Sequence, residues 1–345
     1  MADSKTILKT KNVKKFFPIQ SSFLKRTIGY VRAVDDISLF INEGETFGLV
    51  GESGCGKTTL GRCLSRAIEP TEGAIEFLRA DGQMVNVMDL DARDLQKIRR
   101  DMQIIFQDPY SSLNPRMIVQ EIIAEPLVCN NLMHGQQLRD RVNELIELVS
   151  LSSRHLERYP HAFSGGQRQR IGIARALATN PRFIVCDEAV SALDVSVQAQ
   201  IINLLLDLQQ KLRLSYLFIS HDLSVIQHIS DRVGVMYVGR MVEVAKSEEL
   251  FARPRHPYTE ALLSAKPVPD PRIRSKRIVL TGEIANPAKP PTGCYFHPRC
   301  RYGSPVCGKE TPPFEEIEPG HYTACHRARE LDLQGVYKKA NDMAI

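Results

Sequence analysis

The stretch from Gly51 to Thr58 reads Gly-Glu-Ser-Gly-Cys-Gly-Lys-Thr and fits the pattern G-x-x-x-x-G-K-[ST]. Glycines at these positions let backbone N–H groups turn inward around phosphate oxygens, and a helix N-terminus behind them favours negative charge. Lys57 is expected to reach the β- and γ-phosphates of a nucleotide, and the Thr58 hydroxyl to bind Mg²⁺. The motif predicts a phosphate-binding loop, and the alternative is a chance glycine-rich turn.

Two adjacent carboxylates, Asp187 and Glu188, follow the apolar run Phe183-Ile-Val-Cys. Asp187 is placed to hold the Mg²⁺ shell. Glu188 comes where the predicted strand leaves the sheet, and a carboxylate there can polarise an attacking water. The alternative, an acidic loop after a buried strand, is disfavoured because the same chain carries a phosphate loop.

A second group suited to anions is Phe163-Ser-Gly-Gly-Gln167, which precedes a helix beginning Arg168-Gln-Arg-Ile. Ser164, Gly165 and Gly166 offer a hydroxyl and exposed N–H groups at a helix N-terminus. Further polar groups follow predicted strands or the carboxylates: Gln107 after Met102–Phe106, Ser191-Ala-Leu-Asp194 after Glu188, and His221 after Ser215–Ser220.

Strands and helices must hold these residues in place. Thr46–Val50 predicts a compact strand before the glycine loop, and a helix is expected from about Thr58 to Ile68. The same patterns predict helices at Arg139–Leu151, Gln167–Ala178 and Ser196–Leu212, and short strands at Arg182–Val185 and Ser215–Ser220. Strands alternating with helices indicate an α/β fold with a mainly parallel sheet.

In this order the motifs resemble the nucleotide-binding subunit of an ABC transporter, over about residues 6–250. The resemblance implies a P-loop NTPase with a RecA-like core, an antiparallel β subdomain and a helical signature subdomain at about 108–180. It also implies that two such domains face each other, with ATP between the Walker motifs of one and the signature of the other. The Walker A motif would be Gly51–Thr58, the Walker B motif Phe183–Asp187 and the signature Phe163–Gln167. Each chain would then hold two half-sites, and hydrolysis would need a partner domain.

The family's functional residues can be assigned one by one on these motifs. The resemblance implies catalytic roles for Glu188, His221 and Gln107, and Mg²⁺ ligands at Thr58, Asp187 and Gln107. ATP would contact Gly51, Glu52, Ser53, Gly54, Cys55, Gly56, Lys57, Thr58, Thr59, Phe17, Ser164, Gly165, Gly166 and Gln167. The dimer-facing D-loop would be Ser191, Ala192, Leu193 and Asp194.

The chain departs from the family pattern at two of these places. Phe163 stands where the family usually has Leu, which is a packing position. Ala189 follows Glu188 where the family usually has Pro, so the turn loses a fixed φ but no catalytic group. For the adenine-stacking aromatic, Phe17 is chosen by similarity and Phe16 is the alternative.

Three stretches resemble the dipeptide/oligopeptide importers in particular: His256-Pro-Tyr258 followed by Thr-Glu-Ala-Leu-Leu, Gln107–Pro115, and Ser191–Gln200. The resemblance implies a nucleotide-binding domain at 1–252 and a C-terminal extension at 253–345. It implies partnership with a second ABC ATPase subunit, expected to be a different chain, with a homodimer as the alternative. It also implies two membrane permease subunits and, indirectly, a periplasmic or extracellular solute-binding protein. Nickel and glutathione are alternative cargoes.

Four cysteines, Cys294, Cys300, Cys307 and Cys325, lie in a proline-rich tail without a tight C-x₂₋₄-C pair. Four thiolates suit either an iron–sulfur cluster or zinc, and the loose spacing favours a [4Fe–4S] cluster. Some peptide-importer subunits carry such a cluster, which points the same way. His297, His321 or His326 could replace one ligand, and four unrelated thiols are the alternative.

Composition and charge bear on whether the protein binds nucleic acid, spans a membrane or is secreted. The net charge of +5 is spread along the chain, so a nucleic-acid partner is not expected. No apolar run reaches the ~18 residues of a spanning helix, and the N-terminus lacks a signal peptide's apolar core. We expect a peripheral protein on the cytoplasmic face of the inner membrane. Rival hypotheses are a soluble ABC ATPase outside transport, which one Walker A motif disfavours, and a catalytically silent partner.

Overall fold

The computed structural model describes residues 5–21, 26–265 and 277–336. The chain divides into two compact units, each built from separated segments. The first unit comprises Met1–Leu8, Ile41–Glu45 and Glu76–Ser220, and the second comprises Lys9–Phe40, Thr46–Ile75 and His221–Ile345. The domain boundary predicted near residue 252 stays a prediction. Parts of the predicted C-terminal extension, residues 266–276 and 337–345, lie outside the described residues.

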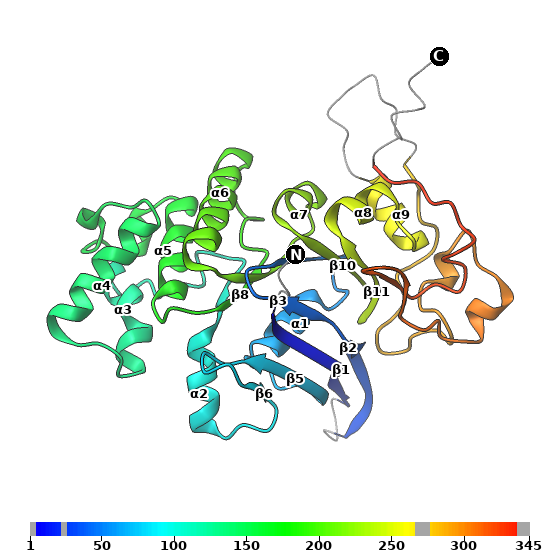
Figure 1. Cartoon of the computed structure of the whole chain (residues 1–345), viewed down its shortest axis with the longest axis horizontal. Coiled ribbons are helices and arrows are strands. Elements are labelled where there is room, and N and C mark those ends of the chain that lie inside the picture. The colour runs from blue at the N-terminus through cyan, green and yellow to red at the C-terminus, as the bar shows by residue number, and fades with distance from the viewer. Residues whose placement is uncertain (1–4, 22–25, 266–276, 337–345) are drawn as a thin grey trace, which may run out of the picture. The chain divides into compact units, whose positions relative to one another are not determined.

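The first unit contains a parallel three-stranded arrangement and most of the long helices (Figure 1). Strand β7 (Met102–Ile105) pairs in parallel with β8 (Phe183–Asp187), which pairs in parallel with β9 (Ser215–Ile219). The other elements of this unit are β6 (Met84–Asn86), α2 (Ala92–Asp101), α3 (Val119–Cys129), α4 (Gly135–Leu148), α5 (Gly165–Leu177) and α6 (Val195–Leu212), with 3₁₀ turns at Ser153–His155 and Pro160–Ala162.

Helices α3, α4 and α5 pack against one another within this unit (Figure 1). Strands β8 and β9 are buried along their whole length, which explains their unbroken apolar sequence. Helix α6 starts at an Asp194 cap and ends where Arg213 takes a left-handed conformation. Both ends are thus encoded by local chemistry.

The second unit contains the glycine loop. Strand β4 (Thr46–Val50) pairs in parallel with β10 (Arg232–Tyr237), and β11 (Arg240–Lys246) pairs antiparallel with β10. Strands β13 (His321–Thr323) and β12 (Glu315–Glu318) continue from β11, each antiparallel to its neighbour. The remaining elements are β2 (Thr27–Ile37), α1 (Lys57–Leu64), α7 (Leu223–Ile229), α8 (Ser247–Ala252) and α9 (Pro257–Ser264), with 3₁₀ turns at His297–Arg299 and Pro305–Gly308.

Three strands contribute residues to both units: β1 (Thr6–Gln20), β3 (Phe40–Asn42) and β5 (Glu72–Leu78). Within the second unit β1 pairs antiparallel with β2, and within the first unit β5 pairs antiparallel with β6. The α/β class predicted from the sequence, with antiparallel strands beside a parallel core, is confirmed.

Most predicted elements are found within a few residues of their expected ends. The helix after the glycine loop is shorter than expected, because Arg66 has a φ of 54° and the chain leaves the helix before it. The predicted run to Leu151 likewise stops at Leu148, before Ser150 with a φ of 58°. Such left-handed residues end helices and are not visible in apolar periodicity.

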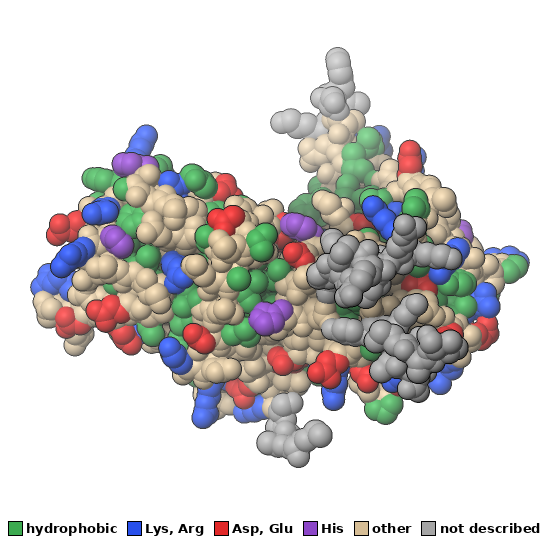
Figure 2. All heavy atoms as spheres, turned by 90° about the horizontal axis from the view of Figure 1, so that it is seen from above, with side chains coloured by type: hydrophobic (Ala, Val, Ile, Leu, Met, Phe, Trp, Pro, Cys, Tyr) green, Lys and Arg blue, Asp and Glu red, His purple; other side chains and the backbone are tan. Residues whose placement is uncertain are grey.

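Charged side chains of both signs are interspersed on the face drawn in Figure 2. Among the described residues, none of the helices combines the length and apolar character required to cross a lipid bilayer.

The hydroxyl of Tyr216 offers a test of how the first unit is held together. Tyr216 is fully buried and its hydroxyl donates to the carbonyl oxygen of Leu205 on α6 at 3.1 Å. Tyr216→Phe is expected to lower the free energy of unfolding by about 1 kcal/mol, because one buried hydrogen bond is lost. Urea unfolding followed by circular dichroism measures this change. Tyr30→Phe, at a side chain 53% exposed, is the control and should leave the midpoint unchanged; equal shifts would contradict the assignment.

Candidate nucleotide site

The glycine loop of the second unit links the buried strand β4 to the N-terminus of α1. Gly51, Gly54 and Gly56 have φ values of 154°, 78° and 105°, where side chains are strained. A Cβ at Gly51 would collide with the carbonyl oxygen of Met236, and one at Gly56 with that of Ala33. Gly51 and Gly56 are therefore required by both backbone conformation and close packing, and Gly54 by backbone conformation alone.

Lys57 is the first residue of α1 and only 5% exposed. Its Nζ donates to the carbonyl oxygens of Gly51 at 2.7 Å and Glu52 at 3.1 Å. The ammonium group thus lies over the loop that precedes its own helix. Burial raises the pKa of the neighbouring Cys55 thiol, which stays protonated as a small packing residue. Thr58 and Thr59 follow in the first turn of α1.

In the first unit, Glu188 directly follows Asp187, the buried last residue of β8. Glu188 has a φ of 48°, a strained conformation for this residue type, and its N–H donates to the carbonyl oxygen of Ile219 at 3.0 Å. The amide of Gln107 donates to its carboxylate, Nε2 to Oε2, at 2.7 Å. The structure therefore brings two of the predicted catalytic residues into direct contact.

The turn after Glu188 is stabilised by its own side chains. The Ser191 hydroxyl donates to the carbonyl oxygen of Glu188 at 3.0 Å. Asp194 caps α6, its Oδ1 accepting from the N–H of Val197 at 3.0 Å and the Ser196 hydroxyl at 2.6 Å. These bonds lower the pKa of Asp194. Ala189, which stands where the family usually has Pro, is buried, with 2% of its surface exposed.

The stretch Phe163–Gln167 forms the beginning of α5. Ser164 is the N-cap: its Oγ accepts from the N–H of Gln167 at 3.4 Å, while its own N–H donates to the Gln167 side chain at 3.1 Å. This reciprocal pair is a capping box, which satisfies two N–H groups at the start of the helix. Phe163 is 5% exposed and packs edge-on against His155, as expected of a packing position.

The two glycines of this stretch lie against the segment that follows Glu188. A Cβ at Gly166 would collide with the Val197 side chain, and one at Gly165 would lie 3.3 Å from Leu193. The predicted signature and D-loop therefore contact each other within the first unit. Ala192 lies in the same turn.

Phe17 and His221 occupy the second unit. Phe17 lies on β1, 37% exposed, with the Lys15 ammonium 5.0 Å from its ring centroid. His221 is exposed and immediately precedes Asp222, the N-cap of α7. The exposed face of Phe17 is compatible with stacking on an adenine, and its role stays a prediction.

Comparison with known proteins decides the family. Residues 34–191 match the family described as ABC transporter, and residues 242–307 match the oligopeptide/dipeptide transporter C-terminal region. The chain is 51% identical over 328 residues to the oligopeptide transport ATP-binding protein AppF of Bacillus subtilis, covering 94% of this chain and 98% of that protein. The chain belongs to the ATP-binding subunits of oligopeptide ABC transporters. It is an ABC-type ATPase.

Other matches support this membership. The putative oligopeptide transport ATP-binding protein YkfD of Bacillus subtilis is 54% identical over 313 residues, which cover 90% of this chain and 93% of that one. Among solved structures, a dimeric post-hydrolysis state of the ATP-binding cassette MJ0796 bound to ADP and Pi matches with a TM-score of 0.60 and 30% identity. That match covers 70% of this chain and 99% of the cassette. The predicted P-loop fold is thereby confirmed.

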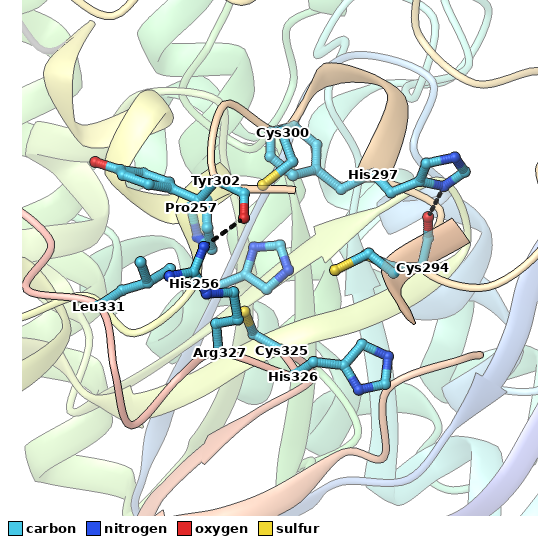
Figure 3. A pocket seen from close by; sticks show the side chains of 12 residues that line it. His256, Pro257, Cys294, His297, Cys300, Tyr302, Cys325, His326, Arg327 and Leu331 are labelled. Atoms are coloured by element: carbon cyan, nitrogen blue, oxygen red, sulfur yellow. Dashed lines mark hydrogen bonds between the residues drawn. The ribbon is translucent and has the colours of Figure 1, made fainter. Parts of the chain in front are cut away.

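In this oligopeptide-transporter subunit the four tail cysteines line one small cavity (Figure 3). Cys294, Cys300 and Cys325 direct their sulfur atoms toward its middle, and Cys307 also lines it. Burial raises the pKa of Cys294 to about 11 and that of Cys325 to about 12, so both thiols are protonated at neutral pH. His297 and His326 line the same cavity.

The predicted [4Fe–4S] cluster is wrong. Over the described ranges, no group of three or more His, Cys, Asp or Glu side chains is arranged to hold a metal ion, and the zinc alternative has no support either. The cavity of about 20 Å³ has room for roughly one water molecule and not for a cluster of iron and sulfur atoms. The four cysteines do line one cavity, but their side chains are not arranged as a set of metal ligands.

The sequence reading overlooked residues of the extension that contact the phosphate loop. The Tyr258 hydroxyl accepts from the N–H of Glu52 at 2.8 Å, and the Arg299 guanidinium binds the Glu52 carboxylate. The stretch His256-Pro-Tyr258 indicated the subfamily but predicted no role for its residues. Arg299 does not belong to any of the motifs found in the sequence. These contacts join positions too far apart in sequence for a local pattern to reveal them.

His256 caps α9, and its charge state should control part of the stability. Its Nδ1 accepts from the N–H of Tyr258 at 3.1 Å, which requires the neutral ring, and burial lowers its pKa from 6.5 to about 3. Below pH 6.5 the unfolded chain binds a proton that the folded chain does not. Stability is therefore expected to fall as the pH falls from 6.5 towards 3, by at most about 1.4 kcal/mol per pH unit.

Urea midpoints at about pH 7 and about pH 5.5 measure this loss. His256→Asn keeps a capping acceptor without the titration and should flatten the pH dependence. The exposed His134→Asn is the control and should retain the wild-type slope. An unchanged slope in His256→Asn would contradict the assignment.

Proposed function

We propose that this ATPase energises the import of di- and oligopeptides across a membrane. The observation that carries the proposal is near-full-length similarity to a protein named for oligopeptide transport, 51% identical over 94% of this chain. The match of residues 242–307 to the oligopeptide/dipeptide transporter C-terminal region supports the same cargo class. Nickel or glutathione carried by the same machinery is the competing cargo.

The proposed assembly contains a second ABC ATPase subunit of a different chain and two membrane permease subunits, with a solute-binding protein delivering cargo from outside. The subunit would bind peripherally at the cytoplasmic face of the membrane. Support comes from the dimer described for the MJ0796 cassette. It also comes from the capped N-terminus of α5 at Ser164, which would meet the nucleotide of a partner domain.

At the nucleotide, the loop N–H groups and Lys57 would hold the phosphates, and the signature of the partner would close the other side. Thr58, Asp187 and Gln107 supply hydroxyl, carboxylate and amide oxygens, the donor types that Mg²⁺ prefers. The ion would neutralise charge on the phosphates when bound. Glu188, held at β8 and hydrogen-bonded by Gln107, would orient and polarise the attacking water, and His221 would assist from the start of α7.

Glu188→Gln tests this assignment in purified protein. We expect ATP hydrolysis to fall by about 100-fold or more, because the general base is lost, while ATP still binds and traps a closed dimer. Phosphate release and size-exclusion chromatography with ATP measure the two effects. Glu147→Gln, on an exposed position of α4, is the matched carboxylate-to-amide control and should hydrolyse ATP normally. Normal turnover in Glu188→Gln would remove Glu188 from its role.

The transport proposal is tested by uptake in cells deleted for the gene. Wild-type protein should restore uptake of a labelled peptide, Glu188→Gln should not, and tagged protein should copurify with membrane subunits from detergent extract. Restored uptake of nickel or glutathione without peptide uptake would redirect the cargo assignment. Copurification with ribosomes instead of membrane proteins would overturn the transport role.

A further inference from the structure

The carboxylate of Glu52, second residue of the phosphate loop, is held by a two-pronged ion pair. Arg299 donates from Nη1 to Oε2 at 2.7 Å and from Nη2 to Oε1 at 3.0 Å. The Arg299 side chain is 7% exposed and that of Glu52 is 23% exposed. Such a fork fixes the orientation of a carboxylate more firmly than a single contact. The two residues are separated by 247 positions in the sequence and lie in the same compact unit.

The backbone of the same loop residue is held from the same side. The N–H of Glu52 donates to the hydroxyl of Tyr258, a fully buried residue of α9. The Tyr258 ring packs against Tyr237 and Phe296, with centroids 4.7 Å and 5.3 Å away. The N–H and the carboxylate of Glu52 are therefore both bonded to side chains of the C-terminal extension, those of Tyr258 and Arg299.

The charge of Glu52 makes this arrangement consequential. A carboxylate within a loop that binds phosphate would repel the nucleotide, since like charges a few ångströms apart disfavour each other strongly near a protein surface. Arg299 supplies the compensating positive charge within the second unit. Its hydrogen bonds to Glu52 raise the pKa of the guanidinium, which stays ionised.

Holding the loop also matters because a glycine-rich backbone has many accessible conformations when contacts do not restrain it. Gly51, Gly54 and Gly56 all adopt positive φ, and glycines reach other conformations at little steric cost. A loop fixed before ATP arrives loses less conformational entropy on binding. The contacts of the Glu52 N–H and carboxylate supply that restraint, in addition to the Lys57 bonds to the carbonyl oxygens of Gly51 and Glu52.

We propose that Arg299 is a positioning residue of the nucleotide site, through which the C-terminal extension neutralises Glu52 and sets the ATP affinity of the phosphate loop. The inference rests on the proposed role of Gly51–Thr58 in binding phosphate. It assigns the extension a function in the ATPase reaction itself.

The test is the affinity for a fluorescent ATP analogue, trinitrophenyl-ATP, together with KM and kcat for ATP. Arg299→Ala is expected to raise Kd and KM about tenfold with little change in kcat, because it exposes the Glu52 charge and loosens the loop without touching the hydrolytic residues. A folded Arg299→Ala protein that binds the analogue as tightly as wild type would overturn the proposal.

A second substitution separates charge from packing. In the Arg299→Ala background, Glu52→Gln removes the unpaired carboxylate and is expected to restore most of the lost affinity. An ion pair that serves only folding would show no such rescue, so failure of the rescue overturns the neutralising role.

Arg299→Lys keeps the charge but loses the fork, and should raise Kd about threefold. Arg299→Lys also provides a test if the Arg299→Ala protein does not fold. An unchanged Kd for Arg299→Lys would overturn the claim that the two-pronged ion pair positions Glu52.

Two controls complete the experiment. Arg301→Ala removes a guanidinium two positions away that binds Glu260 at 3.0 Å, outside the loop, and should lower the thermal midpoint without raising KM for ATP. An equal rise in KM for Arg301→Ala would mark a general effect of the extension and overturn the specific role. Lys57→Ala should abolish binding of the analogue; intact binding would refute the phosphate loop itself, a failure distinct from that of the Arg299 proposal.

Discussion

The conformation of the glycine loop depends on one steric constraint, its passage between closely packed backbone segments of the second unit. Gly51 and Gly56 touch the carbonyl groups of Met236 and Ala33, which leave no room for a side chain. The strands that carry those carbonyls must therefore be in place before the loop can take its shape. Lys57 then bonds to carbonyl oxygens of the loop, which ties the first residue of helix α1 to the loop that follows strand β4.

In the first unit the candidate site residues are positioned differently, by side chains that hydrogen-bond to the backbone at the ends of helices and strands. Ser164 and Asp194 each accept an N–H at a helix start, and Ser191 closes the turn after Glu188. These bonds satisfy groups that a helix end would otherwise leave unpaired. The strained Glu188 is held by its own backbone bond and by Gln107, which suits a group that must be positioned before its substrate arrives.

Local patterns were sufficient for most of the fold. Buried strands such as Thr46–Val50 and the amphipathic helix α6 follow from apolar runs and periodicity over a few residues. Helix ends at Arg66 and Ser150 were misplaced, because a left-handed residue depends on packing as well as on composition. The four cysteines show the same limit: the tertiary fold places them at one cavity, but a ligand set requires an arrangement of side chains that sequence spacing does not encode.

By itself the sequence predicted a phosphate loop, a pair of carboxylates and a signature stretch, and it indicated the transporter family. Each prediction rests on a contiguous motif whose chemistry needs those residue types in that order. Only the tertiary structure decided that Glu52 is bonded to Arg299 and Tyr258 and that the cysteine cavity is too small for a cluster. Those outcomes depend on contacts between residues far apart in the chain. Such contacts are set by the packing of the whole second unit, and no local pattern records them.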